Sequence, residues 1–561
     1  MKVVIVGGVA GGASAAARLR RLDEKAEIVI FERSGHMSYA NCGLPYYIGD
    51  VIREEGALTL QTPQSFYARF RIPVKLRHEV TAILPEEKCV AVKELDTGRE
   101  FKESYDKLIL APGASPTKPR LPGIDLPKLF TLRTVEDTLR IKDYVNKKKP
   151  RSVILAGGGF IGLELAENLR QLGLEVGIVE GLNQLMSPFD PEMAAFIHGE
   201  MRRNGVKLHL GSFVDGFREA DGGVEVLLKS GEALRADMGI LAIGVTPDTA
   251  LARAAGLELG LRGSILVNDR METSVPDIYA VGDAVQVKQL VTGEDSVISL
   301  AGPANKQGRI AADNICGRDS RYPGSLGTSV IKVFDMAAAS TGVNEATAKK
   351  AGLQVDKLYL SPMSHATYYP GGELLNMKIL FEKDTWRLLG AQIVGGNGTD
   401  KRIDVIAAAI QGGLDVRDLA DLQLAYAPPF AAAKDPVNMA GYMAENLSNG
   451  LVKQIHWHDV DGLSRESSVL LDVRTVPEYE RGHAKDFVNI PLHELRERMG
   501  EIPAGKPVYV MCQSALRSYI GCRILTQYGF DCYNIAGGYR LYSTVLQDAE
   551  AAKTAAPCGK E

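Results

Sequence analysis

A glycine-rich pattern occurs twice in the chain and constrains its fold more than any other feature. Residues 2–12 read KVVIVGGVAGG and residues 152–162 read SVILAGGGFIG, and each segment leads into a helical pattern rich in Ala, Leu and Arg. Each copy continues to a second apolar strand that closes on an acid, Glu32 in EIVIFE and Glu180 in EVGIVE. Strand, glycine turn, helix and strand form the β-α-β unit that binds a dinucleotide. The sequence therefore predicts an α/β fold with two Rossmann-like dinucleotide-binding domains.

The first copy carries the groups that a dinucleotide needs. Its turn lets backbone N–H groups approach a pyrophosphate at the positive end of the following helix. Glu32 follows Gly12 by 20 residues, where its carboxylate can accept both ribose hydroxyls. A merely flexible turn would not need a strand before it, a helix after it and an acid at this distance. The expected contacts of this turn are Gly7, Gly8, Ala10, Gly11 and Gly12.

The second copy predicts NADH rather than NADPH. A carboxylate at Glu180 repels a 2′-phosphate, and residues 181–183 (Gly-Leu-Asn) offer no arginine that would bind one. We therefore expect two dinucleotides, with NADH at this second site. The expected contacts are Gly157, Gly159, Phe160, Ile161, Gly162 and Glu180.

The composition is that of an ordinary globular enzyme. A length of 561 residues predicts three or four domains, and 65 Lys and Arg against 69 Asp and Glu leave a net charge of −4. This balance argues against a nucleic-acid-binding protein, and no apolar run is long enough to span a membrane. The start at Met1-Lys2 imitates a signal peptide, but the same residues serve better as the first strand and turn.

The cysteines predict neither a disulfide scaffold nor a bound metal. The chain has seven, with no C-x-x-C pair. This pattern favours a reducing cytoplasm as the setting of the protein.

Further composition changes divide the rest of the chain. Residues 326–445 favour antiparallel strands with packed helices. The polar, turn-rich residues 446–455 predict a linker, and residues 456–550 again alternate strand, loop and helix in a compact final domain. Residues 551–561 are expected to form a disordered tail that contains Cys558.

Three more segments connect the two nucleotide sites to one family. Residues 272–284, ETSVPDIYAVGDA, resemble the second FAD fingerprint of two-dinucleotide flavoproteins. Residues 110–116 (LAPGASP) and 241–248 (LAIGVTPD) resemble their two return-crossing strands. With every piece in family order over residues 1–325, the chain resembles the pyridine nucleotide-disulfide oxidoreductases.

The resemblance implies where the cofactors bind. FAD would occupy a domain of residues 1–115 and 242–325, NADH would occupy residues 116–241, and hydride would pass to flavin N5. Residues 326–445 would be an α+β dimerisation domain. Asp283, in the Gly-Asp pair at a strand end, would hold the ribityl chain. Further implied contacts are Arg33, Asn41, Val80, Ala111, Gly113, Gly244 and Ala301.

One cysteine stands where related enzymes carry a redox disulfide. Glutathione reductase-like members have a C-x-x-x-x-C pair after the first ribose-binding acid, but this chain has only Cys42, in SYANCGLPYY. Cys42 would therefore cycle through a sulfenic acid, a persulfide or a mixed disulfide with an external thiol. A buried core thiol is the alternative, although Gly-Leu-Pro after the cysteine favours a loop. The dimerisation domain also lacks the His-Pro and His-Glu signature of the dithiol mechanism.

Other residues favour the coenzyme A-disulfide reductase branch of the family. Ser14, Arg18 and Arg21 share one face of the first helix, where two guanidiniums can clamp a phosphate. A solvated basic face is the plainer alternative. The resemblance assigns Arg18 and Arg21 to the nucleotide end of coenzyme A, Ser38 and Asn41 to its pantetheine, and Lys434 to a phosphate.

The segments SHATYYPGG and AYAPPFAAAKDPVN also resemble this branch. Tyr368 and Tyr426 would be its two tyrosines, which reach the active-site cysteine of the other subunit of a homodimer. A tyrosine hydroxyl there could give a proton or a hydrogen bond to a leaving thiolate. Tyr368 fits the spacing to Tyr426 better than Tyr369 does. Packing at the interface is the alternative role.

The final domain resembles a single-domain rhodanese of α/β fold. LLDVR at 470–474, the loop CQSALRS that starts at Cys512, and AGGY at 536–539 carry this likeness. N–H groups of the loop would cradle the sulfur of Cys512 and stabilise a persulfide, while Arg517 would bind an anionic sulfur donor. The loop departs from the commoner form with Arg directly after the cysteine, so a preference for thiosulfate does not follow.

The remaining residues of interest have structural roles in this interpretation. Asp472 and Arg474 are expected to form a structural pair rather than a catalytic one. No chemical role is expected for Cys89, Cys316, Cys522 or Cys532.

The sequence thus predicts an FAD-dependent reductase that uses NADH to reduce coenzyme A persulfide, polysulfide or coenzyme A disulfide through Cys42. Sulfane sulfur would be handled at Cys512, and its direct delivery to Cys42 is left open. One alternative is an NADH oxidase or peroxidase with a Cys42 sulfenic acid. Others are a sulfurtransferase with a redox-sensing coenzyme A module and an NADH:acceptor reductase that does not need Cys42.

Overall fold

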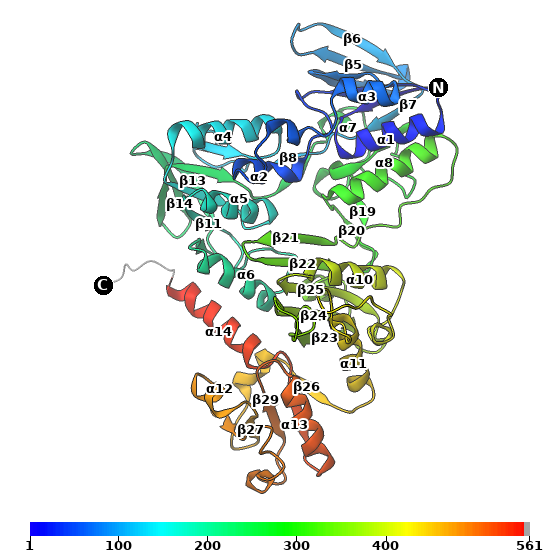
Figure 1. Cartoon of the computed structure of the whole chain (residues 1–561). Coiled ribbons are helices and arrows are strands. Elements are labelled where there is room, and N and C mark those ends of the chain that lie inside the picture. Colours follow the sequence, from blue (N-terminus) through cyan, green and yellow to red (C-terminus); the bar gives the residue numbers. More distant parts are fainter. Residues whose placement is uncertain (555–561) are drawn as a thin grey trace. The chain divides into compact units, whose positions relative to one another are not determined.

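The computed structural model describes residues 1–554 (Figure 1). The chain divides into two compact units. Unit 1 contains Met1–Gly181 and Ser212–Gly327, and unit 2 contains Leu182–Gly211 and the chain from Thr328 onward. No helix within residues 1–554 is both long and apolar enough to cross a membrane. Cys558, in the predicted tail, lies outside the described residues.

Unit 1 contains the first predicted nucleotide unit. Its five-stranded parallel sheet has the order β18-β7-β1-β2-β3, so β7 and β2 flank β1 on opposite sides. The carboxyl end of β1 therefore lies at a switch point of the strand order, where open α/β sheets bind their ligands. The strands are β1 (Lys2–Val6), β2 (Glu27–Glu32), β3 (Val74–Leu76), β7 (Lys107–Leu110) and β18 (Ile278–Ala280).

The second predicted dinucleotide-binding segment, which also lies in unit 1, has the same construction. Its parallel strands follow the order β11-β10-β16-β9, and the equivalent central strand β10 begins at Ser152. Consecutive apolar residues in β1 and β10 are buried, as expected of parallel strands covered on both faces. The strands are β9 (Leu129–Thr131), β10 (Ser152–Ala156), β11 (Glu175–Val179) and β16 (Met238–Leu241).

The helices of unit 1 cover these sheets, and α1 packs along α8 (Figure 1). The predicted return-crossing segments form strands β8 and β17, which pair antiparallel with Ser115 opposite Thr246. The helices are α1 (Ala10–Leu22), α2 (Leu44–Ile48), α3 (Pro63–Phe70), α4 (Val135–Lys148), α5 (Phe160–Gln171), α7 (Ala250–Ala254) and α8 (Ala301–Ile315). The smaller strands are β4 (His78–Leu84), β5 (Cys89–Glu94), β6 (Glu100–Ser104), β8 (Ala114–Pro116), β13 (Val214–Ala220), β14 (Gly223–Leu228), β15 (Ala233–Ala236), β17 (Val245–Pro247), β19 (Val287–Lys288) and β20 (Asp295–Ser296).

Unit 2 contains the predicted antiparallel sheet, in the order β21-β22-β25-β24-β23. Its core includes Leu375, Ile379 and Ile393, on which α10 and α11 pack. The elements are β21 (Ser329–Val333), β22 (Met336–Gly342), α9 (Glu345–Lys350), β23 (Val355–Leu360), β24 (Leu375–Glu382), β25 (Leu388–Gly395), α10 (Thr399–Gln411) and α11 (Pro436–Ser448).

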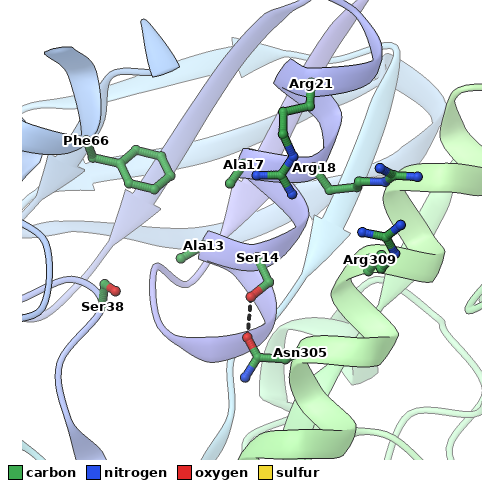
Figure 2. A pocket seen from close by; sticks show the side chains of 9 residues that line it. All are labelled: Ala13, Ser14, Ala17, Arg18, Arg21, Ser38, Phe66, Asn305 and Arg309. Carbon is green, nitrogen blue, oxygen red and sulfur yellow. Dashed lines mark hydrogen bonds between the residues drawn. The ribbon is translucent and has the colours of Figure 1, made fainter. Parts of the chain in front are cut away.

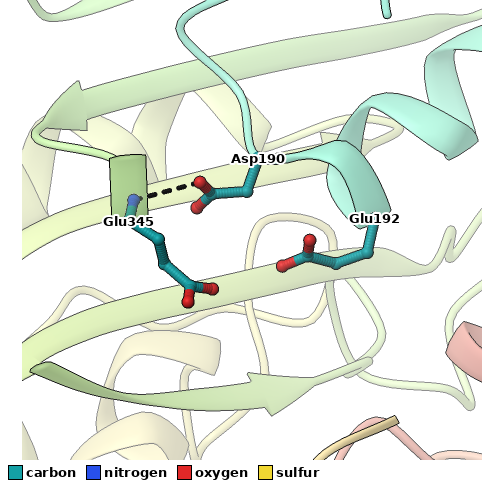
Figure 3. Close-up of side chains that lie close together, drawn as sticks. All are labelled: Asp190, Glu192 and Glu345. Carbon is teal, nitrogen blue, oxygen red and sulfur yellow. Dashed lines mark hydrogen bonds between the residues drawn. The ribbon is translucent and has the colours of Figure 1, made fainter. Parts of the chain in front are cut away.

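A buried ion-pair cluster joins α6 (Pro191–Arg203) to this sheet. Figure 3 shows Asp190, Glu192 and Glu345 converging, with the Glu345 backbone N–H donating to Asp190. Lys378 on β24 donates to all three carboxylates, at 2.6 Å to Asp190 and 2.5 Å to Glu192. Although burial lowers the pKa of Lys378, the charges of Glu192, Asp190 and Glu345 outweigh that effect and raise it. The cluster is therefore a satisfied ion-pair network. It explains why Leu182–Gly211, from the predicted NADH domain, packs within unit 2.

The final domain has a parallel sheet in the order β26-β30-β29-β27-β28. Its core contains Leu471, Val510 and Leu525. Unit 2 also includes β12 (Lys207–His209), and the elements of the final domain are β26 (Lys453–Ile455), β27 (Val469–Asp472), α12 (Val476–Glu480), β28 (Val488–Asn489), β29 (Val508–Met511), α13 (Leu516–Gln527), β30 (Cys532–Ile535) and α14 (Gly538–Thr554).

Two predicted boundaries differ from the structure. Within 446–455, α11 continues to Ser448 because its apolar side extends to Leu447, and Lys453–Ile455 forms β26, so that the connection between them is residues 449–452. Within the predicted tail, residues 551–554 extend α14.

Helix α14 is fastened to α6 by polar contacts. His198 is buried, and its Nε2 accepts from the backbone N–H of Leu185 at 3.0 Å. Its Nδ1 therefore carries the proton and donates to Asp548 at 2.8 Å, while Arg202 donates to the other oxygen of that carboxylate. Arg540 adds a hydrogen bond of 3.0 Å to Asn376 on β24. The final domain is thus held to the rest of unit 2 through several elements.

Candidate active site

The glycine turns of the two nucleotide units have the same close contacts. A Cβ on Gly7 would lie 2.1 Å from the carbonyl oxygen of Ala111, and one on Gly157 would lie 2.3 Å from that of Ala242. Both glycines have positive φ, +98° and +115°. A Cβ on Gly12 would likewise lie 1.9 Å from the carbonyl oxygen of Gly7. The turns therefore exclude any side chain and leave the backbone free to meet a ligand.

Each predicted ribose-binding acid is held at its turn. Glu32 accepts from the backbone N–H of Gly8 at 2.8 Å, and Glu180 accepts from that of Gly158 at 2.7 Å. Within the described chain, a Cβ on Gly159 would meet no atom within 4 Å, so the N-terminus of α5 is open. Glycine backbone, helix N-terminus and acid are the groups that hold a dinucleotide, and both sites fit one.

The other predicted cofactor residues lie in unit 1. Val80 lies in the core of β4, and Arg33 pairs with Asp248 at 2.7 Å. The rest occupy turns or the first residues of helices: Ala10, Gly11, Ala111, Gly113, Phe160, Ile161, Gly162, Gly244 and Ala301.

Arg133, which the sequence analysis missed, connects two predicted flavin-site residues. Its Nη2 donates to Asp283 at 2.7 Å. With its nitrogen turned toward the Arg133 carbonyl, the Asn41 amide makes two contacts of 3.0 Å to Arg133. Arg133 follows β9, about 90 residues from Asn41 and 150 from Asp283, so no local pattern could reveal it.

Cys42 lies in a single 3₁₀ turn, Asn41–Gly43, that leads into α2. The residue is exposed, as the predicted loop position requires. Helix α2 packs on α5, and Tyr46 donates to Glu164 of α5 at 3.4 Å. Desolvation raises the pKa of the Cys42 thiol, Glu164 raises it further, and Arg133 opposes them. Burial raises the pKa of Glu164 to about 7.

A pocket of about 340 Å³ collects four of the residues assigned to coenzyme A. Figure 2 shows Ser14, Arg18 and Arg21 on α1 facing it, with Ser38 on the opposite side. Ser38 is four residues before Cys42, so their Cα atoms are at most about 14 Å apart. The remaining lining residues are Ala13, Ala17, Phe66, Asn305 and Arg309.

The cations of this pocket differ in their surroundings. Arg18 uses its Nε to bind Asp313 at 2.7 Å, and its side chain is largely buried. Arg309 of α8 is a lining cation that the sequence analysis missed, and Asn305, one helical turn before it, accepts from Ser14. The spacing of four residues between Asn305 and Arg309 shows in the sequence that both lie on one face of a helix. That this face lines the pocket follows only from the packing of α8 on α1. Asn41 contacts Arg133 and does not line this pocket.

The two predicted tyrosines meet in unit 2. The hydroxyls of Tyr368 and Tyr426 are 2.6 Å apart, and both side chains are exposed. Tyr369 instead packs edge-on against His365. Lys434, which precedes α11, is exposed.

Cys512 directly follows β29 and is buried. Its carbonyl accepts from Tyr539 N–H at 2.8 Å, which ties the loop to the AGGY turn. A Cβ on Gly538 would lie 2.5 Å from the same carbonyl oxygen. Ala515 has a left-handed backbone (φ +67°) where the chain enters α13. The loop therefore curls tightly after the sulfur, as a persulfide cradle requires.

The charged residues of this domain form two pairs. Arg474 binds Asp472 at 2.7 Å and both are buried, so the two residues form the predicted pair, and its structural role stays a prediction. Arg517 binds Glu478 through two contacts of 2.7 Å. The other cysteines lie in secondary structure or at its end: Cys89 in β5, Cys316 after α8, Cys522 in α13 and Cys532 in β30.

Comparison with known proteins decides the family. The model of the pyridine nucleotide-disulphide oxidoreductases matches residues 1–308, and that of their dimerisation domain matches residues 328–436. The chain belongs to the pyridine nucleotide-disulphide oxidoreductase family. A rhodanese-like domain matches residues 457–544 of this oxidoreductase. The fold class predicted from the sequence is thereby confirmed.

Relatives of the oxidoreductase match most or nearly all of its length. Coenzyme A disulfide reductase of Staphylococcus aureus (strain JH9) is 37% identical over 445 residues, which cover 79% of this chain and all of that protein. The crystal structure of reduced Bacillus anthracis CoADR-RHD is 49% identical, with a TM-score of 0.95 and 98% of each chain covered. The structure of a NAD-dependent persulfide reductase from A. fulgidus is 37% identical, with a TM-score of 0.91 and 97% of this chain and 100% of that chain covered. Membership in the family implies FAD and NAD(H) as cofactors.

Proposed function

We propose that this oxidoreductase uses NADH to reduce coenzyme A persulfide, with polysulfide or coenzyme A disulfide as related acceptors, through Cys42. The pocket of Ser14, Arg18, Arg21 and Ser38 carries the proposal, because Ser38, which lines it, is only four residues from Cys42 along the chain. The names of the relatives, coenzyme A disulfide reductase and persulfide reductase, support the same substrate class.

The charge of the pocket supports a phosphorylated thiol. Arg18, Arg21 and Arg309 place three guanidiniums at one cavity. Guanidinium forks bind phosphate oxygens through paired hydrogen bonds. Phe66 adds an aromatic surface on which an adenine ring could stack. The loop from Ser38 to Cys42 would then run beside the extended arm that carries the thiol.

Cys42 supplies the sulfur chemistry. Its thiolate attacks the outer sulfur of CoA-S-SH, the S–S bond breaks, CoA-S⁻ leaves and Cys42 becomes the persulfide. Two electrons from one NADH and a proton then release sulfide and restore the thiolate. The sum is CoA-S-SH + NADH + H⁺ → CoA-SH + H₂S + NAD⁺. FAD, when bound at the first glycine turn, supplies the two-electron relay between nicotinamide and sulfur.

The hydrogen-bonded pair Tyr368 and Tyr426 supports a role in thiol release. Because the chain carries the family's dimerisation domain, we propose a homodimer in which this pair serves the Cys42 of the partner subunit. A tyrosine hydroxyl can donate to a leaving thiolate. Cys512 would hold sulfane sulfur as a persulfide in its loop, which the rhodanese-like domain supports.

The deciding experiment follows anaerobic NADH consumption with coenzyme A persulfide, for the intact protein and for Cys42→Ser. Stoichiometric sulfide release that disappears in Cys42→Ser is expected. Cys316→Ser is the matched control and should retain full activity. If Cys42→Ser is unimpaired, reduction does not pass through Cys42 and an acceptor reductase takes its place. If turnover waits for oxygen, the protein is an oxidase.

A further inference from the structure

The arginine of the rhodanese-like loop is paired with a carboxylate. Arg517 closes the six-residue loop that begins at Cys512, and both terminal nitrogens of its guanidinium bind Glu478: Nη1 to Oε2 at 2.7 Å and Nη2 to Oε1 at 2.7 Å. This bidentate pairing uses the N–H edge of the guanidinium that would otherwise bind the oxygens of an anionic ligand.

Glu478 is itself fixed in place. It lies in the first turn of α12 and closes a capping box with Thr475, accepting from its backbone N–H at 3.0 Å and its hydroxyl at 2.7 Å. Hydrogen bonds from Arg517 are the largest of several effects that lower the pKa of Glu478 to about 2, so the carboxylate is ionised throughout the neutral range. A ligand that displaced the Glu478 carboxylate from Arg517 would therefore have to break an ion pair.

The other arginine near the loop is also engaged. Arg474 binds Asp472, donates to the Gly482 carbonyl at 2.8 Å and lies 4.0 Å from the ring centre of Tyr539. Its Nη1 also contacts Gln513, the residue after Cys512, at 3.4 Å. Both guanidiniums beside the loop are thus already matched to carboxylates.

The two kinds of sulfur donor make different demands on such a site. Thiosulfate brings a sulfonate whose oxygens need donors when they leave water. An organic persulfide anion carries its single charge on the outer sulfur, which is transferred to Cys512, and presents a carbon chain where thiosulfate has its sulfonate. A carboxylate that occupies the arginine penalises thiosulfate twice, by removing donors and by like-charge repulsion.

We propose that Glu478 is a specificity-determining residue that masks Arg517 and so selects organic persulfides over thiosulfate as donors to Cys512. The proposal rests on the proposed sulfur transfer at Cys512. With a persulfide, the reaction is Cys512-S⁻ + R-S-S⁻ → Cys512-S-S⁻ + R-S⁻. With thiosulfate, it is Cys512-S⁻ + S-SO₃²⁻ → Cys512-S-S⁻ + SO₃²⁻. In each, one S–S bond forms and one breaks, and only the second leaves a sulfonate-derived anion to be bound.

The experiment uses the full chain without NADH, with cyanide as the final sulfur acceptor and thiocyanate as the readout. Donors are thiosulfate and glutathione persulfide, and the variants are Glu478→Ala, Glu478→Gln and the double variant Glu478→Ala/Arg517→Ala. Glu480→Ala, at an exposed position of the same helix, is the matched control. Glu478→Gln keeps the side-chain size and decides the matter if Glu478→Ala does not fold.

In Glu478→Ala and Glu478→Gln, KM for thiosulfate should fall about tenfold, the value of one regained charge-assisted hydrogen bond. The kcat/KM for glutathione persulfide should stay nearly constant, and the double variant should lose the gain. A thiosulfate KM that stays the same or rises, while persulfide loading persists, overturns the masking role alone. If neither donor loads Cys512 in the unmodified protein, the proposed sulfur transfer fails, and this inference fails with it.

Discussion

The hydroxyl of Ser518 lies 3.2 Å from Sγ of Cys512, and both side chains are buried. The same hydroxyl lies 2.6 Å from Oδ1 of Asn534, whose amide nitrogen is held by the Ala515 carbonyl at 3.2 Å. A hydroxyl has one proton, so Ser518 can donate to only one of these partners at a time. A charged sulfur at Cys512 would draw that proton because ionised acceptors form stronger hydrogen bonds.

Ser518→Ala should therefore slow persulfide formation at Cys512. The loss of one hydrogen bond to a charged sulfur predicts a rate about tenfold lower. Persulfide on Cys512 can be followed by intact-protein mass spectrometry after mixing with glutathione persulfide. Ser467→Ala, at an exposed position of the same domain, is the control. An unchanged rate would mean that the loop amides alone stabilise the sulfur.

Glu164 should add to the effect of desolvation in raising the pKa of Cys42. Because the pKa of Glu164 is raised to about 7, its carboxylate forms as the pH rises through neutrality and opposes formation of the Cys42 thiolate. Glu164→Gln removes this charge and should increase iodoacetamide alkylation of Cys42 at pH 8 by about two- to tenfold. Tyr46→Phe removes a hydrogen bond that lowers the pKa of Glu164. In a plot of the Cys42 alkylation rate against pH, the inflection caused by Glu164 should therefore move to higher pH. Alkylation of Cys42 that is indifferent to both changes would contradict the coupling.

Gly12→Ala should abolish flavin retention. Its Cβ would lie 1.9 Å from the backbone oxygen of Gly7, so the turn itself would have to move. Gly302→Ala is the control, since a Cβ there meets no atom within 4 Å in the described chain. The measurement is the ratio of absorbance at 450 nm to that at 280 nm after purification. A Gly12→Ala protein with full flavin content would show that the turn tolerates displacement.

Ala515→Gly should stabilise the rhodanese-like domain. Ala515 adopts a left-handed conformation that costs an alanine about 1 kcal/mol more than a glycine, although glycine loses more chain entropy on folding. The net gain should be roughly 0.5 kcal/mol, visible in the urea midpoint. Ala515→Val places a branched side chain in the same conformation and should destabilise. The reverse order would mean that the Ala515 methyl contributes more by packing than it costs in backbone strain.

The contact of Asp548 with α6 should make stability depend on pH. Burial alone would raise the pKa of Asp548, but His198 and Arg202 outweigh it and lower the pKa below its usual value. A lowered folded pKa gives stability that is present above the ordinary Asp pKa of about 3.9 and is lost as the pH falls through the folded value. Asp548→Asn should therefore cost about 1–3 kcal/mol at pH 7 and converge with the unchanged protein in acid. Calorimetry at pH 7 and at a pH below the folded pKa of Asp548 tests this, with Gln547→Ala as the control.

The nucleotide units could be predicted because their signals are local. Strand, glycines, helix and acid follow one another within about 30 residues, and Gly7 and Gly157 have no tolerable substitute in their turns. The grouping of Ser14, Arg18 and Arg21 also followed from helix periodicity. Their meeting with Ser38 came from the family resemblance rather than from any local rule.

The residues that escaped prediction are contributed by distant elements. Arg133 contacts Asp283 from 150 residues away, and Arg309 faces the pocket only because α8 packs on α1. The predicted linker was wrong in part because β26 is a short, polar edge strand. Lys453 and Gln454 give it no apolar alternation, and its pairing with β30 supplies the missing signal.

The attachment of α14 to α6 can form only long after α6 has been synthesised. Asp548 and its partner His198 are 350 residues apart. At about 5–20 residues per second, a ribosome needs roughly 20–70 s to make that stretch. During this interval α6 exists without the carboxylate that its buried imidazole binds. The surface that receives α14 must therefore stay unaggregated until Asp548 has been synthesised, and a chain truncated before Asp548 would keep it exposed permanently.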